Sequence, residues 1–473
     1  MSFKKIKLFL SQPHTLFVVI SIIFGGAFIA VTPPLWGLDE PSHFARVFHI
    51  TKGDFIPTSD QDNPGSHVPD NYFELSNYRT ADILDVVPTE NSVLGRADVT
   101  EGSIYDRLTN RPFSDTEHFF PFIAGYSPVA YPGAIIGDAI ARLLDMNIGS
   151  TLQLTRIFSL LAYIAISAIA IWILRHYKLR WLFFLVALIP TAIYQASMIT
   201  ADSTLIGVSL LFFAVITKIF LTKDTGVNRK LLALLAITAI LLPLIKVNHI
   251  FISAAILLIP FVALGTKKFA LLYKAGVLFA GLVLSFIWST LTKVTDAPAF
   301  SQRADQLQIL PSEQINFVLH NPFEFVYAVA RSLIVHGDMY YQGLLFTVSG
   351  NSVQAPLILT VLLSACLLIG AMYAKDELLR TQKLIIGLCV GVVLTSVTIF
   401  ASLYAGFSPV GWDFVDGVQG RYFLPLLMPF LMLASILLPA KFIIKEKSLK
   451  LAAISLAIIC LLVSVTYVYL ALY

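Results

Sequence analysis

Residues 13–50 read PHTLFVVISIIFGGAFIAVTPPLWGLDEPSHFARVFHI, an apolar run followed at once by two adjacent carboxylates, Asp39 and Glu40. The apolar part is about 18 to 20 residues long, enough to cross a bilayer as an α-helix. Acidic side chains at the mouth of such a helix are costly to hold there, so they mark a candidate site. This stretch therefore predicts a membrane protein whose functional residues begin where its first span ends.

The composition of the whole chain favours the same class of protein. Of 473 residues, 57% are hydrophobic and only 13% are charged, and the mean hydropathy is +0.79. Soluble chains are usually about a quarter charged. The three cysteines, Cys366, Cys389 and Cys460, lie inside apolar runs, at spacings that suit neither a disulfide framework nor a metal site. We expect them to be free thiols in the helix bundle or against lipid.

Apolar runs bounded by charge predict a single all-α polytopic membrane domain, residues 1–473, with about eleven transmembrane helices. The expected spans are residues 13–32, 153–174, 181–200, 203–222, 231–245, 248–264, 269–291, 354–374, 383–404, 421–439 and 450–472. With the N-terminus inside, every cytoplasmic segment is rich in Lys and Arg, as the positive-inside rule requires. These segments are KKIK, RHYKLR, LTKDTGVNRK, TKK, AKDELLRTQK and KFIIKEKSLK. We therefore expect an uncleaved first helix and an outward-facing C-terminus.

Three segments would then face outward. The first, residues 33–150, is rich in Asp and Glu, and we expect mostly loop with short helices, including a juxtamembrane helix near 123–145. The alternative, that 123–145 is a span, would place RHYKLR outside. In the second segment, 293–353, Asn321 and Pro322 predict the start of a helix of about 14 residues, too short to cross alone. The third segment, 405–420, is short.

The acidic pair opens a predicted helix from Pro41 to about Ile50, which places His43 and Arg46 on one face. A carboxylate there can take the proton from an incoming hydroxyl, with His43 or Glu40 in support. Two alternatives remain open from the residues alone. The pair can be a solvated helix cap, or it can bind a divalent cation. We rank the cation second, because no third acidic ligand lies at an obvious spacing.

Basic residues at the outer ends of later spans are candidate phosphate ligands. Arg421 lies in GVQGRYFLP, and Lys246 lies in LLPLIKVNHIF. Gln419 and Tyr422, close to Arg421 in the sequence, are candidates for the same phosphate site. An arginine fork binds phosphate well, whereas the alternative for both cations is snorkelling to the headgroups. For Asp202, in ITADST, we expect a helix-capping role. Weaker candidates to surround the site are Arg46, Tyr131, His249, Arg331 and His336.

Several motifs then occur in a fixed order: WGLDEPSHFARVF, YSPVAYP, ADS, the lysine of LLPLIKVN, and GVQGRYFLP. This order resembles a large bacterial family of polytopic membrane proteins that is grouped with the GT-C glycosyltransferase superfamily. The DEPSHF run also resembles the first-loop motif of protein O-mannosyltransferases and of the lipid A aminoarabinose transferase. The resemblance covers nearly the whole chain. The larger superfamily members carry a soluble C-terminal domain, which we do not expect here, and this leaves the acceptor open.

The resemblance implies a GT-C-like bundle in which Asp39 is the base, Glu40 supports it, and Arg421 and Lys246 hold the phosphate of a polyprenyl-linked sugar. The implied activity is transfer of that sugar to a hydroxyl of a surface glycan or lipid, at the outer leaflet of the bacterial cytoplasmic membrane, without a cofactor. No nucleotide-binding phosphate loop is present. Membrane lipids are expected partners, and nucleic acid is not. The alternatives are a polymerase or ligase that uses diphosphate-linked glycans, and a transporter or flippase for a lipid-linked glycan.

Overall fold

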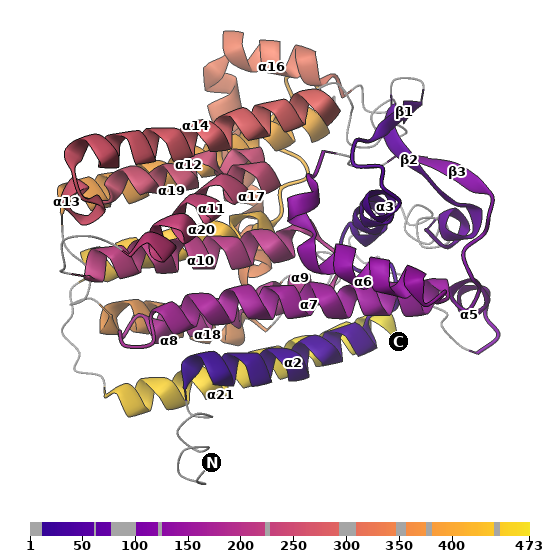
Figure 1. The fold of residues 1–473 in the computed structure, drawn as a ribbon, viewed down its shortest axis with the longest axis horizontal. Helices are drawn as coiled ribbons and strands as arrows, with labels where there is room; N and C mark the ends of the chain where they lie inside the picture. The colour runs from indigo at the N-terminus through magenta and orange to yellow at the C-terminus, as the bar shows by residue number, and fades with distance from the viewer. Residues whose placement is uncertain are drawn as a thin grey trace.

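The computed structural model of the chain describes residues 12–60, 63–76, 101–121, 125–222, 228–292, 309–346, 356–374, 381–438 and 445–473. These residues form a bundle of helices that carries a smaller cap at one end (Figure 1). The bundle helices are α2 (Pro13–Val31), α7 (Ile148–Ile173), α10 (Ala201–Leu221), α11 (Arg229–Ile245), α14 (Lys267–Thr292), α18 (Leu357–Tyr373), α19 (Gln382–Phe407), α20 (Leu424–Leu437) and α21 (Glu446–Leu472).

Within the described ranges, seven helices are long and apolar enough to cross a membrane, or eight if the bent pair α8–α9 is one span. They are α2, α7, α10, α14, α19, α21 and the helix from Gly420 to Leu437. The chain is thus a mostly helical, multi-pass membrane protein, and its apolar helices contact membrane lipids. The larger number of about eleven spans stays a prediction, because the remaining predicted spans are broken or shorter than these helices.

Two of the predicted spans are not single straight helices. Residues 181–200 form α8 (Arg180–Ala187) and α9 (Pro190–Ser197), which meet at a 56° bend. The cause is Pro190, because a residue before proline is driven out of the helical region, and Ile189 has φ −56° and ψ 133°. The bend leaves the end of α9 buried in the centre of the bundle rather than at its edge.

The predicted span 248–264 is also broken, into η2 (Val247–His249), α12 (Ile250–Ser253), η3 (Ala254–Leu258) and α13 (Phe261–Leu264). Pro260 interrupts this segment. Carbonyls that leave a helix inside a membrane need another donor. The buried Lys274 of α14 supplies it by donating to the carbonyls of Leu257 and Ile259. Lys274 therefore has a structural role, because it stabilises the broken segment next to α14.

The cap consists of residues from the first outer segment. It contains α3 (Glu40–Thr51), α5 (Ile104–Thr109), η1 (Pro128–Ala130) and α6 (Pro132–Leu143). A three-stranded antiparallel sheet, which the sequence analysis did not predict, joins β1 (Thr58–Asp60), β2 (Asn63–Pro69) and β3 (Glu117–Pro121). In its register His67 lies opposite Phe119.

Helix α6 occupies the predicted juxtamembrane position and is too short to cross a bilayer. It lies directly on α7 because Gly133 and Gly137 have no side chains. A Cβ atom on Gly133 would lie 2.2 Å from the carbonyl oxygen of Phe158. On the other side, Arg142 of α6 donates to the carbonyl of Phe48 at 2.8 Å. Helix α6 thereby fastens α3 to the bundle.

The second outer segment forms α16 (Pro311–His320) and α17 (Pro322–Phe346). Helix α17 begins at Pro322 as predicted, but the predicted length of about 14 residues is wrong, since the helix has 25. It continues because its last turns pack on η6 (Gly420–Phe423), where a Cβ on Gly420 would lie 2.0 Å from the carbonyl oxygen of Tyr340. Gly420 therefore permits a close contact between η6 and α17.

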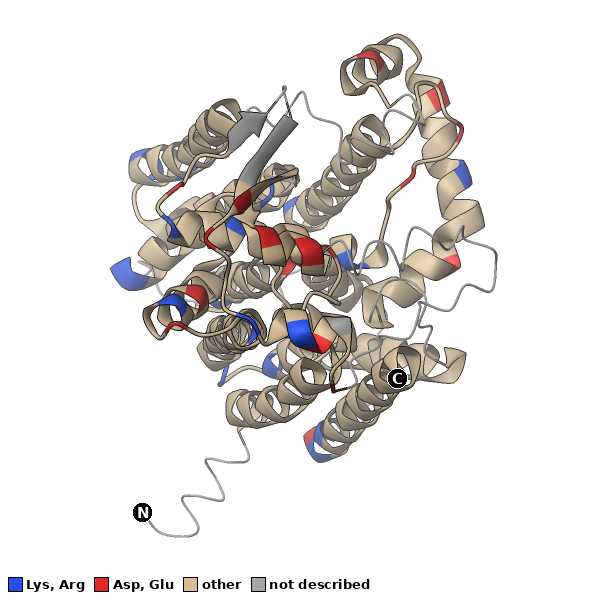
Figure 2. Cartoon of the chain, turned by 90° about the vertical axis from the view of Figure 1, so that its right-hand side faces the viewer, with Lys and Arg blue, Asp and Glu red and all other residues tan. Residues whose placement is uncertain are grey.

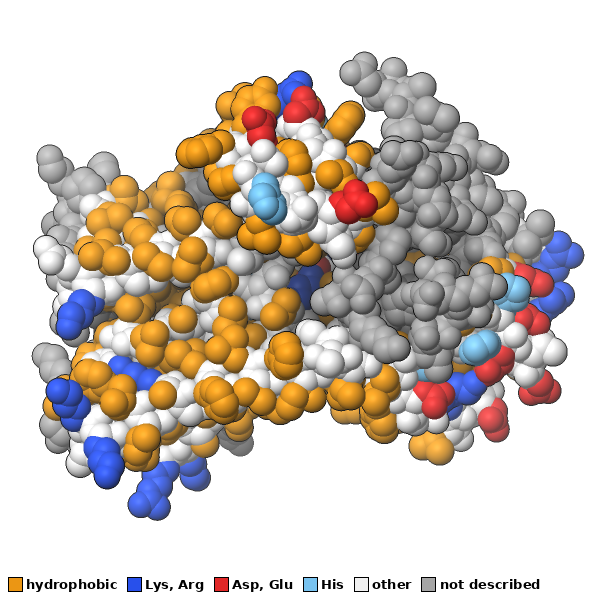
Figure 3. All heavy atoms as spheres, turned by 90° about the horizontal axis from the view of Figure 1, so that it is seen from above, with side chains coloured by type: hydrophobic (Ala, Val, Ile, Leu, Met, Phe, Trp, Pro, Cys, Tyr) orange, Lys and Arg blue, Asp and Glu red, His pale blue; other side chains and the backbone are white. Residues whose placement is uncertain are grey.

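Charge is segregated between the two ends of the bundle. Figure 3 shows Lys and Arg side chains gathered at one end, and Asp, Glu and His side chains with a few basic ones at the other end and on a part midway between. Hydrophobic side chains cover much of the remaining length (Figure 3). Figure 2 looks onto the acidic end, where the cap lies. The three cysteines are free, as predicted, and Cys366 and Cys460 are buried.

Candidate functional site

Asp39 occupies the N-cap position of α3, but its side chain does not cap the helix. Its backbone is left-handed, with φ 54° and ψ 12°. Such a conformation costs free energy in a non-glycine residue and is concentrated at functional sites. The carboxylate turns away from α3, and Oδ2 accepts a hydrogen bond from Nη2 of Arg421. The interpretation of Asp39 as a simple helix cap is therefore wrong.

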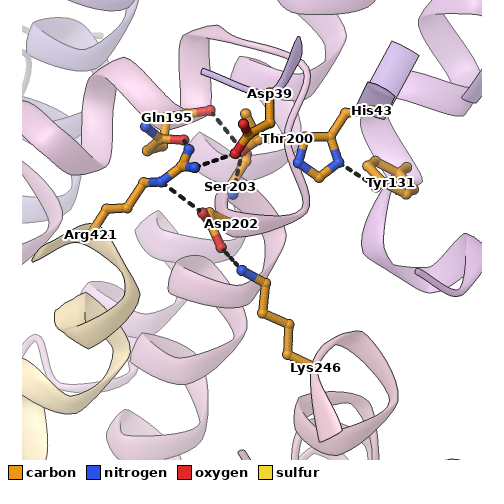
Figure 4. Close-up of polar contacts among 9 residues, drawn as sticks. All are labelled: Asp39, His43, Tyr131, Gln195, Thr200, Asp202, Ser203, Lys246 and Arg421. Carbon is orange, nitrogen blue, oxygen red and sulfur yellow. Dashed lines mark hydrogen bonds and ion pairs between the residues drawn. The ribbon is translucent and has the colours of Figure 1, made fainter. Parts of the chain in front are cut away.

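Arg421 is one member of a chain of four charged side chains, Asp39–Arg421–Asp202–Lys246 (Figure 4). Nε of Arg421 lies 3.8 Å from Oδ2 of Asp202, and Nζ of Lys246 lies 2.5 Å from Oδ1 of the same residue. The side chains of Asp39 and Lys246 are 34% and 18% exposed, whereas those of Arg421 and Asp202 are 1% and 6% exposed. The two more accessible groups of this charged chain are thus the carboxylate of Asp39 and the ammonium group of Lys246. The buried side chains of Arg421 and Asp202 connect them.

Four separate segments build the charged chain. Asp39 begins α3, Asp202 lies in the first turn of α10, Lys246 ends α11, and Arg421 lies in η6. The cap of α10 is Thr200, whose hydroxyl accepts from the backbone N–H of Ser203 at 3.3 Å. The expectation that Asp202 acts as a helix cap is therefore wrong, and its carboxylate instead pairs with both cations.

Glu40 is completely buried and binds Arg156 of α7. Nε of Arg156 donates to Oε1 at 2.7 Å, and Nη2 donates to Oε2 at 2.5 Å. The backbone N–H groups of Gly37 and Ile199 donate to the same carboxylate at 3.0 and 3.2 Å. Burial raises the pKa of Glu40, but Arg156 and these N–H groups outweigh it and hold the pKa below its usual value. This geometry gives Glu40 a positioning role, because it fixes the start of α3 and hence Asp39.

Other groups hold the loop before α3. Arg156 also donates to the carbonyls of Thr32 and Pro33, at 2.5 and 2.8 Å. The hydroxyl of Tyr105 donates to the carbonyl of Pro34 at 2.8 Å. The unusual backbone of Asp39 is therefore clamped through the residues that precede it.

His43 lies on the side of α3 that faces the charged chain. Its Nδ1 is 2.6 Å from the hydroxyl of Tyr131, and the Nε2 edge of the ring faces Asp39 (Figure 4). Burial lowers the pKa of His43 to about 4, although Asp39 and Asp202 act in the opposite direction. The imidazole is therefore neutral near pH 7, and Tyr131 orients it.

Two aromatic rings flank the accessible ammonium group. Nζ of Lys246 lies 5.1 Å from the ring centroid of Tyr422 and 5.6 Å from that of Tyr126. The guanidinium carbon of Arg421 lies 5.2 Å from the ring of Tyr422. Such cation–π contacts favour retention of both positive charges in a partly buried site.

The remaining predicted residues have varied environments. Arg46 is buried and donates to the carbonyls of Tyr126 and Phe55, which makes it a clamp between parts of the cap. His249 is buried, and neither ring nitrogen has a hydrogen-bond partner among the described residues. The buried Oε1 of Gln419 likewise has no partner in the part of the chain that the structure describes.

Arg331 and His336 belong to a different contact. Arg331 forms an ion pair with Asp413, and its guanidinium carbon lies 4.2 Å from the ring of Phe414. The ring of His336 lies 5.6 Å from that of Phe414. Both residues attach α17 to the third outer segment, and no contact joins them to Asp39 or Arg421 among the described side chains.

The alternative of a cation bound by the acidic pair does not fit the directions of the two carboxylates. Asp39 binds Arg421, whereas Glu40 binds Arg156. Among the described residues, no three His, Cys, Asp or Glu side chains are grouped so that they could hold a metal ion. The two acids are neighbours in the sequence but serve separate arginines.

Two residues of this region were missed by the sequence analysis. Arg156 was readable as an arginine near the start of a predicted span, where an ionisable residue deserves a role. Gln195 is the second, and its Oε1 accepts from Nη1 of Arg421 at 3.3 Å. The sequence does not predict this contact, because a single glutamine in a mostly apolar run forms no pattern from which its partner can be inferred.

With this geometry in hand, the chain can be compared with known proteins. The family of predicted membrane proteins designated DUF2142 matches residues 22–431. The chain belongs to this family. The match includes Asp39, Asp202, Lys246 and Arg421, so the charged chain lies within the region shared with the DUF2142 family. Searches among curated proteins and among solved structures find no match.

Proposed function

We propose that this DUF2142 protein is a glycosyltransferase with a GT-C-like bundle. It moves a sugar from a polyprenyl-phosphate donor to a hydroxyl of a surface glycan or lipid, by a single inverting displacement. The observation that carries the proposal is the charged chain itself. Its accessible carboxylate, Asp39, suits a base for the acceptor, and its accessible ammonium, Lys246, suits a donor phosphate. Arg421 lies between Asp39 and the Asp202–Lys246 pair, so its guanidinium can contact either the base or the phosphate.

In the proposed step, the acceptor oxygen forms a bond to the anomeric carbon of the sugar. The bond from that carbon to the phosphate oxygen breaks, and its electron pair stays on the phosphate. The acceptor proton passes to Asp39, with the neutral His43 beside it to orient the acceptor hydroxyl. One displacement at the anomeric carbon inverts its configuration.

The total charge of the groups around Arg421 does not change in this step. A sugar phosphodiester carries one negative charge, and the polyprenyl phosphate that leaves gains a second. Asp39 loses one negative charge when it takes the proton, so the total charge of the site stays constant. Nη2 of Arg421, which contacts Asp39, can transfer its hydrogen bond to the phosphate as charge develops there.

We infer from the charge distribution that the site faces outward. The basic end of the bundle is expected in the cytoplasm (Figure 3). The cap, whose helix α3 begins next to Asp39, lies at one end of the bundle (Figure 1). Polyprenyl-linked donors can reach this level through the lipid. The protein would then act on the outer leaflet of a bacterial cytoplasmic membrane.

The test is a transfer assay with purified protein in proteoliposomes and a panel of polyprenyl-phosphate sugars, with sugar–acceptor products identified by mass spectrometry. Surface glycans of a deletion strain supply the acceptor preparation. The expected result is that proteoliposomes with the wild-type protein transfer one sugar with inversion at its anomeric carbon. Liposomes without the protein should transfer none. Transfer from diphosphate-linked oligosaccharides in place of monophosphate donors would instead support a polymerase or ligase.

One observation favours a second candidate, a transporter for a lipid-linked glycan. Transporters often bind substrate at broken helices, and the 56° break between α8 and α9 leads to Gln195 beside Arg421. A transporter would move the labelled lipid across the vesicle bilayer without changing its mass. Movement of intact donor, with no product of transfer, would replace the enzyme proposal with this one.

A further inference from the structure

Gln195 is an amide in the last turns of α9, next to the guanidinium of Arg421. Its side chain is fully buried, and Oε1 accepts from Nη1 of Arg421 at 3.3 Å. A guanidinium only donates hydrogen bonds, so the amide oxygen must face it. This contact therefore fixes which side of the amide carries the NH2 group.

The Nε2 group of Gln195 is buried and has no hydrogen-bond partner among the described residues. Buried polar groups are normally satisfied, and each exception asks for an explanation. Methionine at this fully buried position of α9 would fill a similar volume without a polar group. Its two N–H donors therefore point to a ligand with acceptor atoms beside Arg421.

We propose that Gln195 is a further ligand of the donor phosphate, and this inference rests on the proposed glycosyltransferase function. In the structure, Arg421 faces Asp39 with Nη2, Gln195 with Nη1 and Asp202 with Nε. When a phosphate oxygen takes the place of Asp39 at Nη2, a second phosphate oxygen accepts from Nε2 of Gln195.

Phosphate fits this position better than a sugar hydroxyl does. The guanidinium of Arg421 and the Nε2 group of Gln195 are both donors, and an anion offers only acceptors to them. The neutral amide also adds a hydrogen bond without adding charge. It can therefore bind the phosphate while the charges of the four ionised groups remain balanced.

The experiment measures binding of polyprenyl phosphate to the purified full-length protein in detergent. Gln195→Met should bind it roughly 10-fold more weakly than the wild type, as expected for the loss of a hydrogen bond to a charged group. Gln195→Glu should lose more, because its carboxylate would pair with Arg421 and repel the phosphate. Ser197→Ala is the matched control, since this buried hydroxyl of α9 donates only to the carbonyl of Ile193.

Two further probes identify the source of the phosphate contact. Polyprenol, which lacks phosphate, should bind wild type and Gln195→Met equally. Inorganic phosphate should compete with polyprenyl phosphate in the wild type, and this competition should weaken in Gln195→Met. If Gln195→Met fails to give a monodisperse protein, Gln195→Asn retains the amide with a shorter reach and should still show weakened binding.

Unchanged binding of polyprenyl phosphate by Gln195→Met, or by Gln195→Asn in its place, overturns the inference. The outcome is separable from that of the proposed function. If the variants weaken phosphate binding while the wild type transfers no sugar, the phosphate site stands and the glycosyltransferase proposal fails. If the wild type transfers sugar and the variants bind phosphate normally, the glycosyltransferase proposal stands and the role of Gln195 as a phosphate ligand fails.

Discussion

Asp39 and Arg421 lie 382 positions apart in the sequence, yet the carboxylate of one accepts a hydrogen bond from the guanidinium of the other. The pair lies between the start of α3 and the η6 turn, and only the Asp39 side is appreciably exposed. A buried arginine that holds an accessible carboxylate can serve structure or chemistry. Each of the following predictions separates these two roles at a named residue.

Asp39→Asn should abolish most of the sugar transfer while the protein still folds. The amide keeps the size of the side chain but cannot accept a proton, and loss of a positioned base costs about 10²–10⁴ in rate. The measurement is the transfer rate with saturating lipid-linked donor. The control is Asp54→Asn, which alters an exposed acid outside the charged chain. Near-normal transfer by Asp39→Asn in folded protein would assign the base to another group.

Arg421→Lys should weaken catalysis through the donor rather than through the acceptor. Lysine retains the positive charge but loses the planar fork that contacts Asp39, Gln195 and Asp202 together. We expect a fall of roughly 10²-fold in kcat/KM for the donor, in line with the loss of one oriented donor to a developing charge. Arg331→Lys, which alters a cation outside this cluster, is the control. Equal losses for donor and acceptor would argue against a phosphate role.

The parts of the site that could be predicted are those with a local signal. Asp39, Lys246 and Arg421 are charges at the ends of apolar runs, which a hydropathy pattern exposes directly. The break before α9 also has a local signal, Pro190, although an apolar run of this length predicts one continuous span. In contrast, the partners of these charges depend on contacts between distant segments, so neither the Glu40–Arg156 pair nor the place of Gln195 could be derived.

The same distinction applies to the fold. Long apolar helices such as α2, α7 and α10 were located within a few residues, because their signal is a continuous run. The extra length of α17 was missed, since its last turns are held by packing on Gly420 and not by helix propensity. The sheet of the cap was missed for a similar reason. Strand β2 contains Pro and Gly, and its pairing with β3 joins residues about 50 positions apart, such as His67 and Phe119.

Glu40→Gln should lower the stability of the protein, and any loss of sugar transfer should follow from that. It leaves the buried Arg156 without its charged partner, and breaking a buried ion pair costs about 3–5 kcal/mol. Thermal unfolding in detergent should therefore show a lower Tm for Glu40→Gln. The double variant Glu40→Leu with Arg156→Met should recover part of that loss, because no unpaired charge remains. If Glu40→Gln retains the wild-type Tm but loses transfer, Glu40 takes part in the reaction and is not a positioning residue.

His43 should make the folded protein sensitive to mild acid. Burial lowers the pKa of its imidazole from 6.5 to about 4, so between these values the unfolded chain binds a proton that the folded protein does not. Stability from this group is therefore complete above pH 6.5 and is lost as the pH falls toward 4. We expect His43→Gln to reduce the fall in Tm between pH 7 and pH 5, measured with both proteins in the same detergent. Tyr131→Phe removes the hydroxyl beside Nδ1 but retains the imidazole, so it should preserve this pH dependence. An identical fall in Tm for His43→Gln and the wild type would mean that other groups carry the acid sensitivity, with His49 and its depressed pKa the first to examine.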